Sequence, residues 1–312
     1  MKTKQLGNSD LNVSVVGIGC MMFGLMCDQK QTSAIIKAAL DAGINFYDTA
    51  DIYGGPHGRS EELVGKALGA ERKNIILTTK FGAQSGGKGG SVPGGGTAAY
   101  INEHLETSLR QLGTDYLDLY QYHFPDTSTP AEETLRALED LVKSGKVRFV
   151  GCSNMNGEQL QEAVAAATEL GITGYVSAQN WYSLLTRGIE ADLLPVAEAN
   201  NISLIPYFPL ESGLLTGKYR KGQDAPPDSR LAKWGGFGSA AKLDKVEPLI
   251  SYAESLGCSM LDLAMGGLTS RPFVATVIAG VTKPEQVKQN AAAGNVEFSA
   301  EQLADIDRIS AA

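Results

Sequence analysis

The feature that most constrains the fold of this chain is the repeated alternation of a short β-branched run with an amphipathic helical segment. Continuous apolar runs of this length are typical of parallel strands that are covered on both faces. Helical segments, among them 59–68 and 284–293, fill the gaps between the runs. This alternation predicts an α/β fold with a parallel sheet. The predicted strands are 13–17, 43–47, 74–78, 116–121, 147–151, 175–179, 203–207 and 276–279.

The spacing of these runs favours a closed barrel over an open sheet. The first seven predicted strands follow one another at intervals of roughly 30 to 40 residues, which suits one strand–helix unit of a (β/α)₈ barrel. The last gap is longer, and segment 218–240 supplies a long loop insertion after strand seven, of a kind that is usually functional. Segment 3–13 is expected to form an N-terminal β-hairpin. We therefore predict one (β/α)₈ TIM-barrel domain over residues 1–312, with functional residues at the C-terminal ends of its strands.

Composition and charge argue against several classes of function. A formal net charge of −8 disfavours a nucleic-acid partner, because phosphates would be repelled. The N-terminus lacks the apolar region of a signal peptide, and no apolar run is long enough to span a bilayer, so we expect a cytoplasmic protein with no membrane partner. Three dispersed histidines and no paired cysteines predict no metal site. We expect free thiols at Cys20, Cys27, Cys152 and Cys258.

Four ionisable side chains follow three successive predicted strands. Asp48 and Tyr53 come after the second strand, Lys80 after the third and His123 after the fourth. Adjacent barrel strands are about 4.8 Å apart, so these side chains should meet at one rim. Taken singly, each has a structural alternative, since a strand-end Asp or Lys is most often a cap or a surface charge and a Tyr usually packs.

Together, the four side chains suit the reduction of a carbonyl group. A phenol with a pKa of about 10 is a poor acid at neutral pH. A neighbouring Lys80 ammonium should lower that pKa, and Asp48 would keep the ammonium charged and in place. Tyr53 can then protonate a carbonyl oxygen as hydride reaches the carbon, while His123 orients that oxygen or helps to relay the proton.

Several ordered motifs, which extend to the C-terminus, resemble those of the aldo-keto reductase superfamily. The Asp48-x₄-Tyr53 pattern, the strand-end Lys80 and the strand-end His123 match its catalytic pattern. Further similar segments are 151–154 (G-x-S-N), 179–185 (Q-x-x-Y-S-L-L), 207–219 after the seventh strand, and 280–290. The resemblance covers nearly the whole chain and implies a TIM barrel that binds a nicotinamide cofactor on its rim.

The resemblance also implies a role for each matching residue. Tyr53 would be the general acid/base, tuned by Lys80 and Asp48, and His123 would orient the substrate carbonyl. The nicotinamide would be held by Ser153, Asn154 and Gln179 and stacked on Tyr207. The pyrophosphate would lie along Leu210, Ser212 and Leu215. The remaining cofactor contacts would be Lys218, Gly280, Thr282, Lys283 near the 2′-phosphate, and Gln286 and Asn290 near adenine.

Two positions depart from the family pattern. Lys283 is the lone cation where many members also carry an arginine, and a lysine lacks the bidentate fork, so the predicted cofactor is NADP(H) with NAD(H) possible. Glu211 stands where a small residue is common, and its carboxylate would weaken pyrophosphate binding if it pointed inward.

The substrate is expected to be a small neutral carbonyl compound or the corresponding alcohol, because no cluster of Arg or Lys marks an anionic one. We predict that apolar residues line the substrate pocket, and for several of them the alternative is packing in the core. These residues are Met22, Phe23, Phe81, Phe124, Trp181, Trp234 and Phe237.

Two other functions are compatible with this pattern. The β-subunits of voltage-gated potassium channels share the fold and much of the tetrad, so the chain could be a cofactor-binding regulatory subunit. A barrel lyase or aldolase would instead use Lys80 as a Schiff base and need no nicotinamide. The sequence does not predict the oligomeric state.

Overall fold

The computed structural model describes residues 1–55, 58–84, 89–220 and 239–311. Eight parallel strands form one sheet in the order β10-β3-β4-β5-β6-β7-β8-β9, and a parallel bridge between Leu204 and Val274 links its two edges. The nearly closed barrel and the two-stranded hairpin confirm the predicted fold. The strands are β1 (Thr3–Gln5), β2 (Asn12–Ser14), β3 (Val16–Gly19), β4 (Phe46–Asp48), β5 (Ile76–Phe81), β6 (Leu117–Tyr122), β7 (Val147–Ser153), β8 (Tyr175–Trp181), β9 (Ser203–Tyr207) and β10 (Val277–Gly280).

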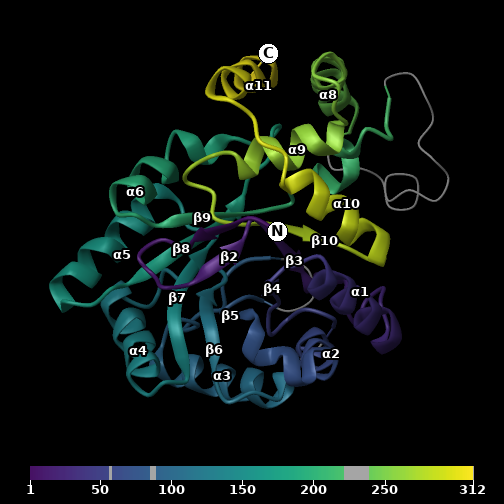
Figure 1. Ribbon diagram of the computed structural model, residues 1–312. Helices are drawn as coiled ribbons and strands as arrows, with labels where there is room; N and C mark the ends of the chain where they lie inside the picture. The colour runs from purple at the N-terminus through teal and green to yellow at the C-terminus, as the bar shows by residue number, and fades with distance from the viewer. Residues whose placement is uncertain (56–57, 85–88, 221–238, 312) are drawn as a thin grey trace.

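Helices surround the strands, as Figure 1 shows. Their buried apolar faces pack against the outside of the sheet and form the larger core of the molecule. The α-helices are α1 (Gln29–Asp41), α2 (Arg59–Leu68), α3 (Ala98–Leu112), α4 (Ala131–Lys143), α5 (Gly157–Leu170), α6 (Leu193–Ala199), α8 (Ser239–Ser255), α9 (Met260–Thr269), α10 (Pro284–Gly294) and α11 (Ala300–Ala311). Short 3₁₀ helices are η1 (Cys20–Met22), η2 (Gly69–Asn74), η3 (Gly188–Glu190) and η4 (Glu211–Thr216).

Several predicted strand boundaries were wrong. The predicted strand 13–17 is divided at Val15 between the hairpin strand β2 and the barrel strand β3. Strand β5 runs on to Phe81, three residues beyond its predicted end, so Lys80 lies within a strand. The sequence pattern did not predict this extension, because Thr78, Thr79 and Lys80 are polar. These residues nevertheless pair with β6, so the strand continues beyond its apolar part.

The hairpin closes the N-terminal end of the barrel. Its buried residues Leu6, Leu11 and Val13 pack on inward-facing barrel side chains in a second apolar cluster, which includes Phe46 and Leu119. Without the hairpin, these inward-facing side chains would be exposed to water. The hairpin therefore serves as a plug, and chemistry is left to the opposite end.

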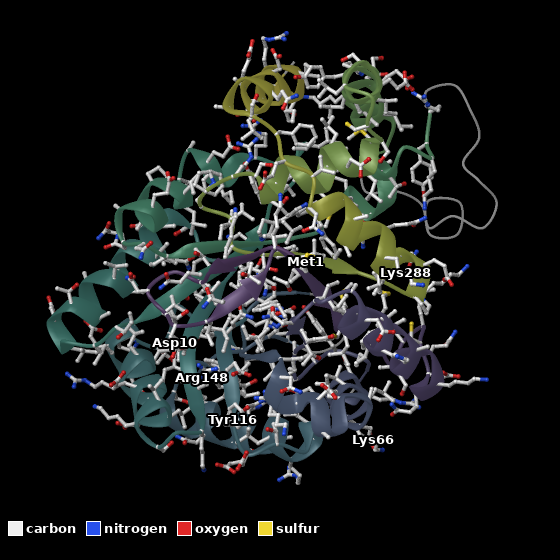
Figure 2. The ribbon with its side chains drawn as sticks, in the orientation of Figure 1. Met1, Asp10, Lys66, Tyr116, Arg148 and Lys288 are labelled. Atoms are coloured by element: carbon white, nitrogen blue, oxygen red, sulfur yellow. The ribbon has the colours of Figure 1, made fainter. Side chains whose placement is uncertain are left out.

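Charged residues tie the hairpin to the barrel. Asp10 Oδ1 lies 2.9 Å from Arg148 Nη2, and Figure 2 shows the two residues side by side. Arg148 also pairs with Asp118 at 2.7 Å, and Asp118 pairs with Arg72 at 2.8 Å. These residues form a continuous chain of opposite charges across β6 and β7, and its outer pair with Asp10 is exposed.

The long gap after the seventh barrel strand, β9, contains helices α8 and α9 as well as η4. Residues 221–238, the centre of the predicted insertion, lie outside the described residues, and Trp234 and Phe237 with them. Among the described residues, no helix combines the length and apolar character needed to cross a membrane.

Candidate active site

The Asp48 carboxylate and the Lys80 ammonium form a buried ion pair at the C-terminal ends of β4 and β5. Lys80 Nζ lies 2.7 Å from Asp48 Oδ2 and donates a second hydrogen bond of 2.7 Å to the Thr49 carbonyl oxygen. Both charged side chains are shielded from solvent. A buried charge pair is tolerated only when hydrogen bonds satisfy its remaining atoms. Here the strands that carry the pair must also supply those partners.

Two glutamine side chains satisfy the second carboxylate oxygen of Asp48. Gln121 Nε2 and Gln179 Nε2 lie 3.2 Å and 2.9 Å from Asp48 Oδ1. Gln121 on β6 also donates to Thr78 Oγ1 at 2.8 Å. Gln121 was not among the predicted site residues, although it is a polar residue near the end of a predicted strand, as Gln179 is. The carboxylate is therefore held rigidly, and it fixes the position of the lysine.

Tyr53 and His123 complete the group. The Tyr53 hydroxyl lies 3.5 Å from Lys80 Nζ, and the Tyr53 ring meets the His123 ring edge to face, with centroids 5.7 Å apart. Tyr53 is partly exposed on the loop after β4, whereas His123 is buried directly after β6. The structure thus brings all four predicted side chains together, with the phenol nearest the solvent.

The protonation states follow from burial and from the lysine. Loss of solvent raises the pKa of Tyr53, and the opposing field of Lys80 does not reverse this shift. The predicted net lowering was therefore wrong, because desolvation of the phenolate outweighs the ammonium. Burial lowers the pKa of Lys80, but Asp48 and Tyr53 outweigh it and the net pKa is raised. Burial and then Lys80 hold the pKa of His123 well below its ordinary range. At neutral pH the site therefore contains a protonated phenol, an ammonium and a neutral imidazole.

Polar groups predicted to hold the nicotinamide lie beside this tetrad and are linked to one another. Asn154 Nδ2 donates to the His123 carbonyl and to Ser153 Oγ, both at 3.0 Å. Ser153 Oγ donates to the Gln179 carbonyl at 2.8 Å, and Tyr207 Oη donates to Asn154 Oδ1 at 2.6 Å. Asn154 has a left-handed backbone, with φ of 55°, a conformation that asparagine adopts more readily than most non-glycine residues. These groups form a preorganised polar rim.

The loop after β9 has an unusual run of left-handed residues. Positive φ angles occur at Phe208, Glu211, Ser212 and Gly213, the last at 102°. Two N–H groups of this turn already donate within the loop, from Glu211 to the Phe208 carbonyl at 3.1 Å and from Gly213 to the Leu210 carbonyl at 2.7 Å. Gly213 has a φ that favours glycine, and a Cβ there would be in ordinary contact with the Lys218 ammonium at 3.5 Å.

The predicted pyrophosphate residues on this loop differ in what they can offer. Leu210 and Ser212 are partly exposed, but Leu215 is fully buried and its N–H already donates to the Leu210 carbonyl. Glu211 is buried and its carboxylate turns away, toward the β8 end. In this orientation the Glu211 carboxylate does not point toward the predicted pyrophosphate site and would not repel a phosphate there.

The residues predicted to meet the adenosine end gather at the start of α10. Gln286 Oε1 accepts from the Thr282 N–H at 2.8 Å and from the Lys283 N–H at 3.2 Å, so it caps the helix. Lys283 is exposed at the N-cap position, Gly280 is exposed at the end of β10, and Asn290 is buried on the helix. A helix N-terminus with an adjacent cation suits a phosphate group.

The predicted substrate-pocket residues divide into two groups. Phe23 and Phe81 are fully buried, and Phe81 stacks on Tyr122 with centroids 4.9 Å apart. These two side chains pack in the core, which corrects their assignment to the pocket. The partly exposed residues, which remain candidates, are Met22, Phe124 and Trp181. Phe124 stacks on His123 at 5.1 Å between centroids, next to the tetrad.

Two further apolar side chains near the rim were not among the predicted site residues. Leu25 and Met26 are 60% and 49% exposed on the segment between η1 and α1. This segment packs against the loop of Tyr53, since a Cβ on Gly54 would lie 2.6 Å from the Phe23 carbonyl oxygen. A hollow of about 810 Å³ beside Arg72 and Lys146 lies at the opposite end of the barrel and has no part in this site.

Comparison with known proteins identifies the family. The Aldo/keto reductase family matches residues 15–311. The L-glyceraldehyde 3-phosphate reductase of Escherichia coli (strain K12) is 33% identical over 99% of this chain and 92% of its own. A probable voltage-gated potassium channel subunit beta of Oryza sativa subsp. japonica is 36% identical over 93% of this chain and 90% of its own.

A solved structure supports the same conclusion. The aldo-keto reductase AKR11C1 from Bacillus halodurans, in its holo form, superimposes with a TM-score of 0.81 at 32% identity, covering 99% of this chain and 96% of that one. A TIM barrel with an Asp, Tyr, Lys and His group at its C-terminal rim is the architecture of an oxidoreductase class. This chain belongs to the Aldo/keto reductase family.

Proposed function

We propose that this protein reduces aldehydes or ketones to alcohols with NADP(H), or catalyses the reverse oxidation, with Tyr53 as the proton donor or acceptor. One observation carries the proposal: the hydroxyl of the partly exposed residue Tyr53 lies 3.5 Å from a Lys80 ammonium that is itself fixed by Asp48. This arrangement offers a proton at the rim and a positive charge to receive the phenolate that remains.

Each side chain has a distinct task in carbonyl reduction. A bound nicotinamide cofactor supplies the hydride. Tyr53 is protonated at neutral pH, and the Lys80 charge favours its phenolate, so it can give its proton to the carbonyl oxygen as the carbon is reduced. Lys80 stabilises the resulting phenolate, and Asp48 keeps Lys80 in position. His123, neutral because its pKa is well below the ordinary range, can hold the carbonyl oxygen without competing as an acid.

The described residues fit a dinucleotide along the rim. The polar group of Ser153, Asn154 and Tyr207 lies beside the tetrad, and the left-handed turn at Ser212 is in the loop that follows β9. Lys283 is exposed at the start of α10, where an ammonium and a helix N-terminus together favour a 2′-phosphate. We therefore favour NADP(H) over NAD(H).

Other functions receive less support. Lys80 is fully buried and paired with Asp48, and its raised pKa keeps it protonated, which opposes Schiff-base formation by a lyase. Similarity to potassium channel β-subunits is about as strong as similarity to reductases. Turnover distinguishes a reductase from a regulatory subunit, because a regulatory subunit would bind the cofactor but show little turnover with any carbonyl.

A direct assay tests the proposal. The wild-type chain is mixed with NADPH and a panel of aliphatic, aromatic and sugar aldehydes and ketones, and NADPH absorbance is followed. We expect consumption with at least one member, and a lower KM for NADPH than for NADH. The variant Lys283→Met should narrow that difference in KM. Binding of NADPH without consumption on the whole panel would contradict the reductase proposal and favour a regulatory subunit.

A further inference from the structure

Glu211 is the position where this chain departs from the family pattern in its cofactor loop, and its surroundings are unusual for a carboxylate. The residue is only 4% exposed, and its backbone has a φ of 48°. A non-glycine residue in the left-handed region is strained and persists only where its surroundings hold it. The contacts of the side chain show what holds it.

The Glu211 carboxylate accepts hydrogen bonds from the last residue of β8 and from the segment that follows it. Oε1 accepts from Ser183 Oγ at 2.6 Å, from Thr186 Oγ1 at 2.7 Å and from the Trp181 indole Nε1 at 3.0 Å. Ser183 Oγ in turn accepts from the N–H groups of Leu185 and Thr186, at 3.1 Å and 3.0 Å. Charge-assisted hydrogen bonds of this kind are the strong ones in proteins. One carboxylate oxygen therefore organises the turn after β8.

Two subsites of the proposed reaction meet at this residue. On one side, Glu211 holds the indole of Trp181, a candidate wall of the substrate pocket. On the other side, its backbone opens the left-handed turn of Ser212 and Gly213, a candidate pyrophosphate site. Aromatic contacts reinforce the link, because Phe208 meets Trp181 edge to face at 5.8 Å between centroids and meets Tyr207 at 5.3 Å.

We propose that Glu211 is a positioning residue that couples cofactor binding to the shape of the substrate pocket. Its carboxylate ties the β9 loop to the Trp181 segment, so neither subsite can move without the other. The inference rests on the proposed use of a nicotinamide cofactor. It adds that the carboxylate, far from repelling phosphate, preorganises the loop for it.

The chain offers a specific optical probe for this coupling. It contains two tryptophans, Trp181 and Trp234, so Trp234→Phe leaves the Trp181 indole as the sole indole fluorophore. In that background, titration with NADPH quenches the emission and gives a Kd without any turnover. The substrate KM is measured separately with a carbonyl that the parent reduces.

Three variants in this background separate coupling from simple destabilisation. Glu211→Ala removes the acceptor, and we expect the Kd for NADPH and the KM for the carbonyl both to rise about tenfold, with a changed Trp181 emission even before cofactor is added. Glu211→Gln keeps an oxygen that accepts from the same donors, and its Kd should stay nearer the parent. Trp181→Phe, measured by direct calorimetric binding, should raise the carbonyl KM but leave the NADPH Kd within about twofold.

The outcomes are distinguishable. An unchanged NADPH Kd in Glu211→Ala overturns the coupling, as does a Glu211→Gln variant no better than Glu211→Ala. Should Glu211→Ala fail to fold, Glu211→Asp takes its place, because it draws the carboxylate back from its donors, and an unchanged Kd there also overturns the coupling. Absence of NADPH binding by the wild-type chain would instead contradict the proposed function.

Discussion

Both ends of the barrel bury a carboxylate with basic partners, but at each end the cation meets a partly exposed tyrosine in a different way. At the hairpin end, Asp118 accepts from Arg148 at 2.7 Å, from Arg72 at 2.8 Å and from the Leu77 N–H at 3.0 Å. The Arg72 guanidinium lies over the Tyr116 ring, 4.0 Å from its centroid. The Arg72 cation therefore interacts with the face of the Tyr116 ring and not with its hydroxyl group. We interpret this cluster as one that stabilises the fold.

At the opposite end, the lysine partner of Asp48 reaches a tyrosine hydroxyl. Lys80 Nζ is 3.5 Å from Tyr53 Oη, and Tyr53 is partly exposed at the rim. An ammonium is a point charge that can stabilise a phenolate, whereas a delocalised guanidinium over a ring face cannot do so as directly. A buried ion pair is therefore no sign of function by itself. What matters is whether its charge acts on an ionisable group that a substrate can reach.

The largest expected effect is at the reactive end. Lys80→Met removes the cation that stabilises the Tyr53 phenolate, so kcat should fall about 10³-fold, or roughly 4 kcal/mol in activation free energy. Steady-state NADPH oxidation measures the loss, with cofactor binding followed in parallel by fluorescence. A kcat within tenfold of the wild type would show that this lysine does not assist the chemical step.

Removing the carboxylate at the hairpin end should affect stability and spare the chemistry. Asp118→Ala leaves the Arg72 and Arg148 guanidinium groups without their shared partner and should lower the free energy of unfolding by about 3 kcal/mol. Urea unfolding followed by circular dichroism measures this change. The kcat of the folded variant should stay within about twofold. A drop in kcat as large as that of Lys80→Met would erase the distinction between the two ends.

Two buried groups near the reactive end should give opposite pH dependences of stability. The His123 pKa is held low in the folded state, so the unfolded state binds more protons below about pH 6.5, and stability falls on acidification. Burial raises the pKa of Glu61 to about 7, so its folded state binds the extra proton, and stability falls as the pH rises from about 4.5 to 7.

Replacing each group should therefore tilt the stability curve in opposite directions. Between about pH 5 and 7, His123→Gln should make stability fall with rising pH relative to the wild type, and Glu61→Gln should make it rise, each by up to about 1.4 kcal/mol per pH unit. Urea midpoints across this range provide the measurement. Parallel curves for all three proteins would mean that these two groups titrate alike in the folded and unfolded states.

The smallest effect belongs to the outer link of the charge chain. The Asp10 and Arg148 side chains are 73% and 40% exposed, so Asp10→Asn should cost less than about 1 kcal/mol of unfolding free energy. The same urea experiment, repeated at high salt, checks this. A loss as large as that of Asp118→Ala would mean that the hairpin is held by this exposed pair and not by apolar packing.

The sequence predicted the barrel and the tetrad because both depend on periodic position. Alternating strands and helices predict the sheet, and the ends of parallel strands bring Asp48, Lys80 and His123 to one rim. The direction of the Tyr53 pKa shift was predicted wrongly, because the weight of desolvation against the Lys80 field depends on the depth of the site.

Packing details were beyond sequence reasoning for the same reason. Phe81 and Phe124 follow similar patterns in the sequence, yet one is buried in the core and the other faces the rim. One acceptor of the Lys80 ammonium is the backbone carbonyl of Thr49, and a backbone contact cannot be predicted from the type of side chain at that position. Likewise, the orientation of Glu211 is set by donors about 25 to 30 residues away in sequence.

We propose that the tyrosine beside an ion-paired cation is a proton donor at one end of the barrel and a structural residue at the other. Matched variants test it directly: Tyr53→Phe and Tyr116→Phe each remove one hydroxyl group. With NADPH and a reducible carbonyl, kcat for Tyr53→Phe should fall at least 10²-fold, and kcat for Tyr116→Phe should stay within about twofold. Equal rates for the two variants would contradict the account.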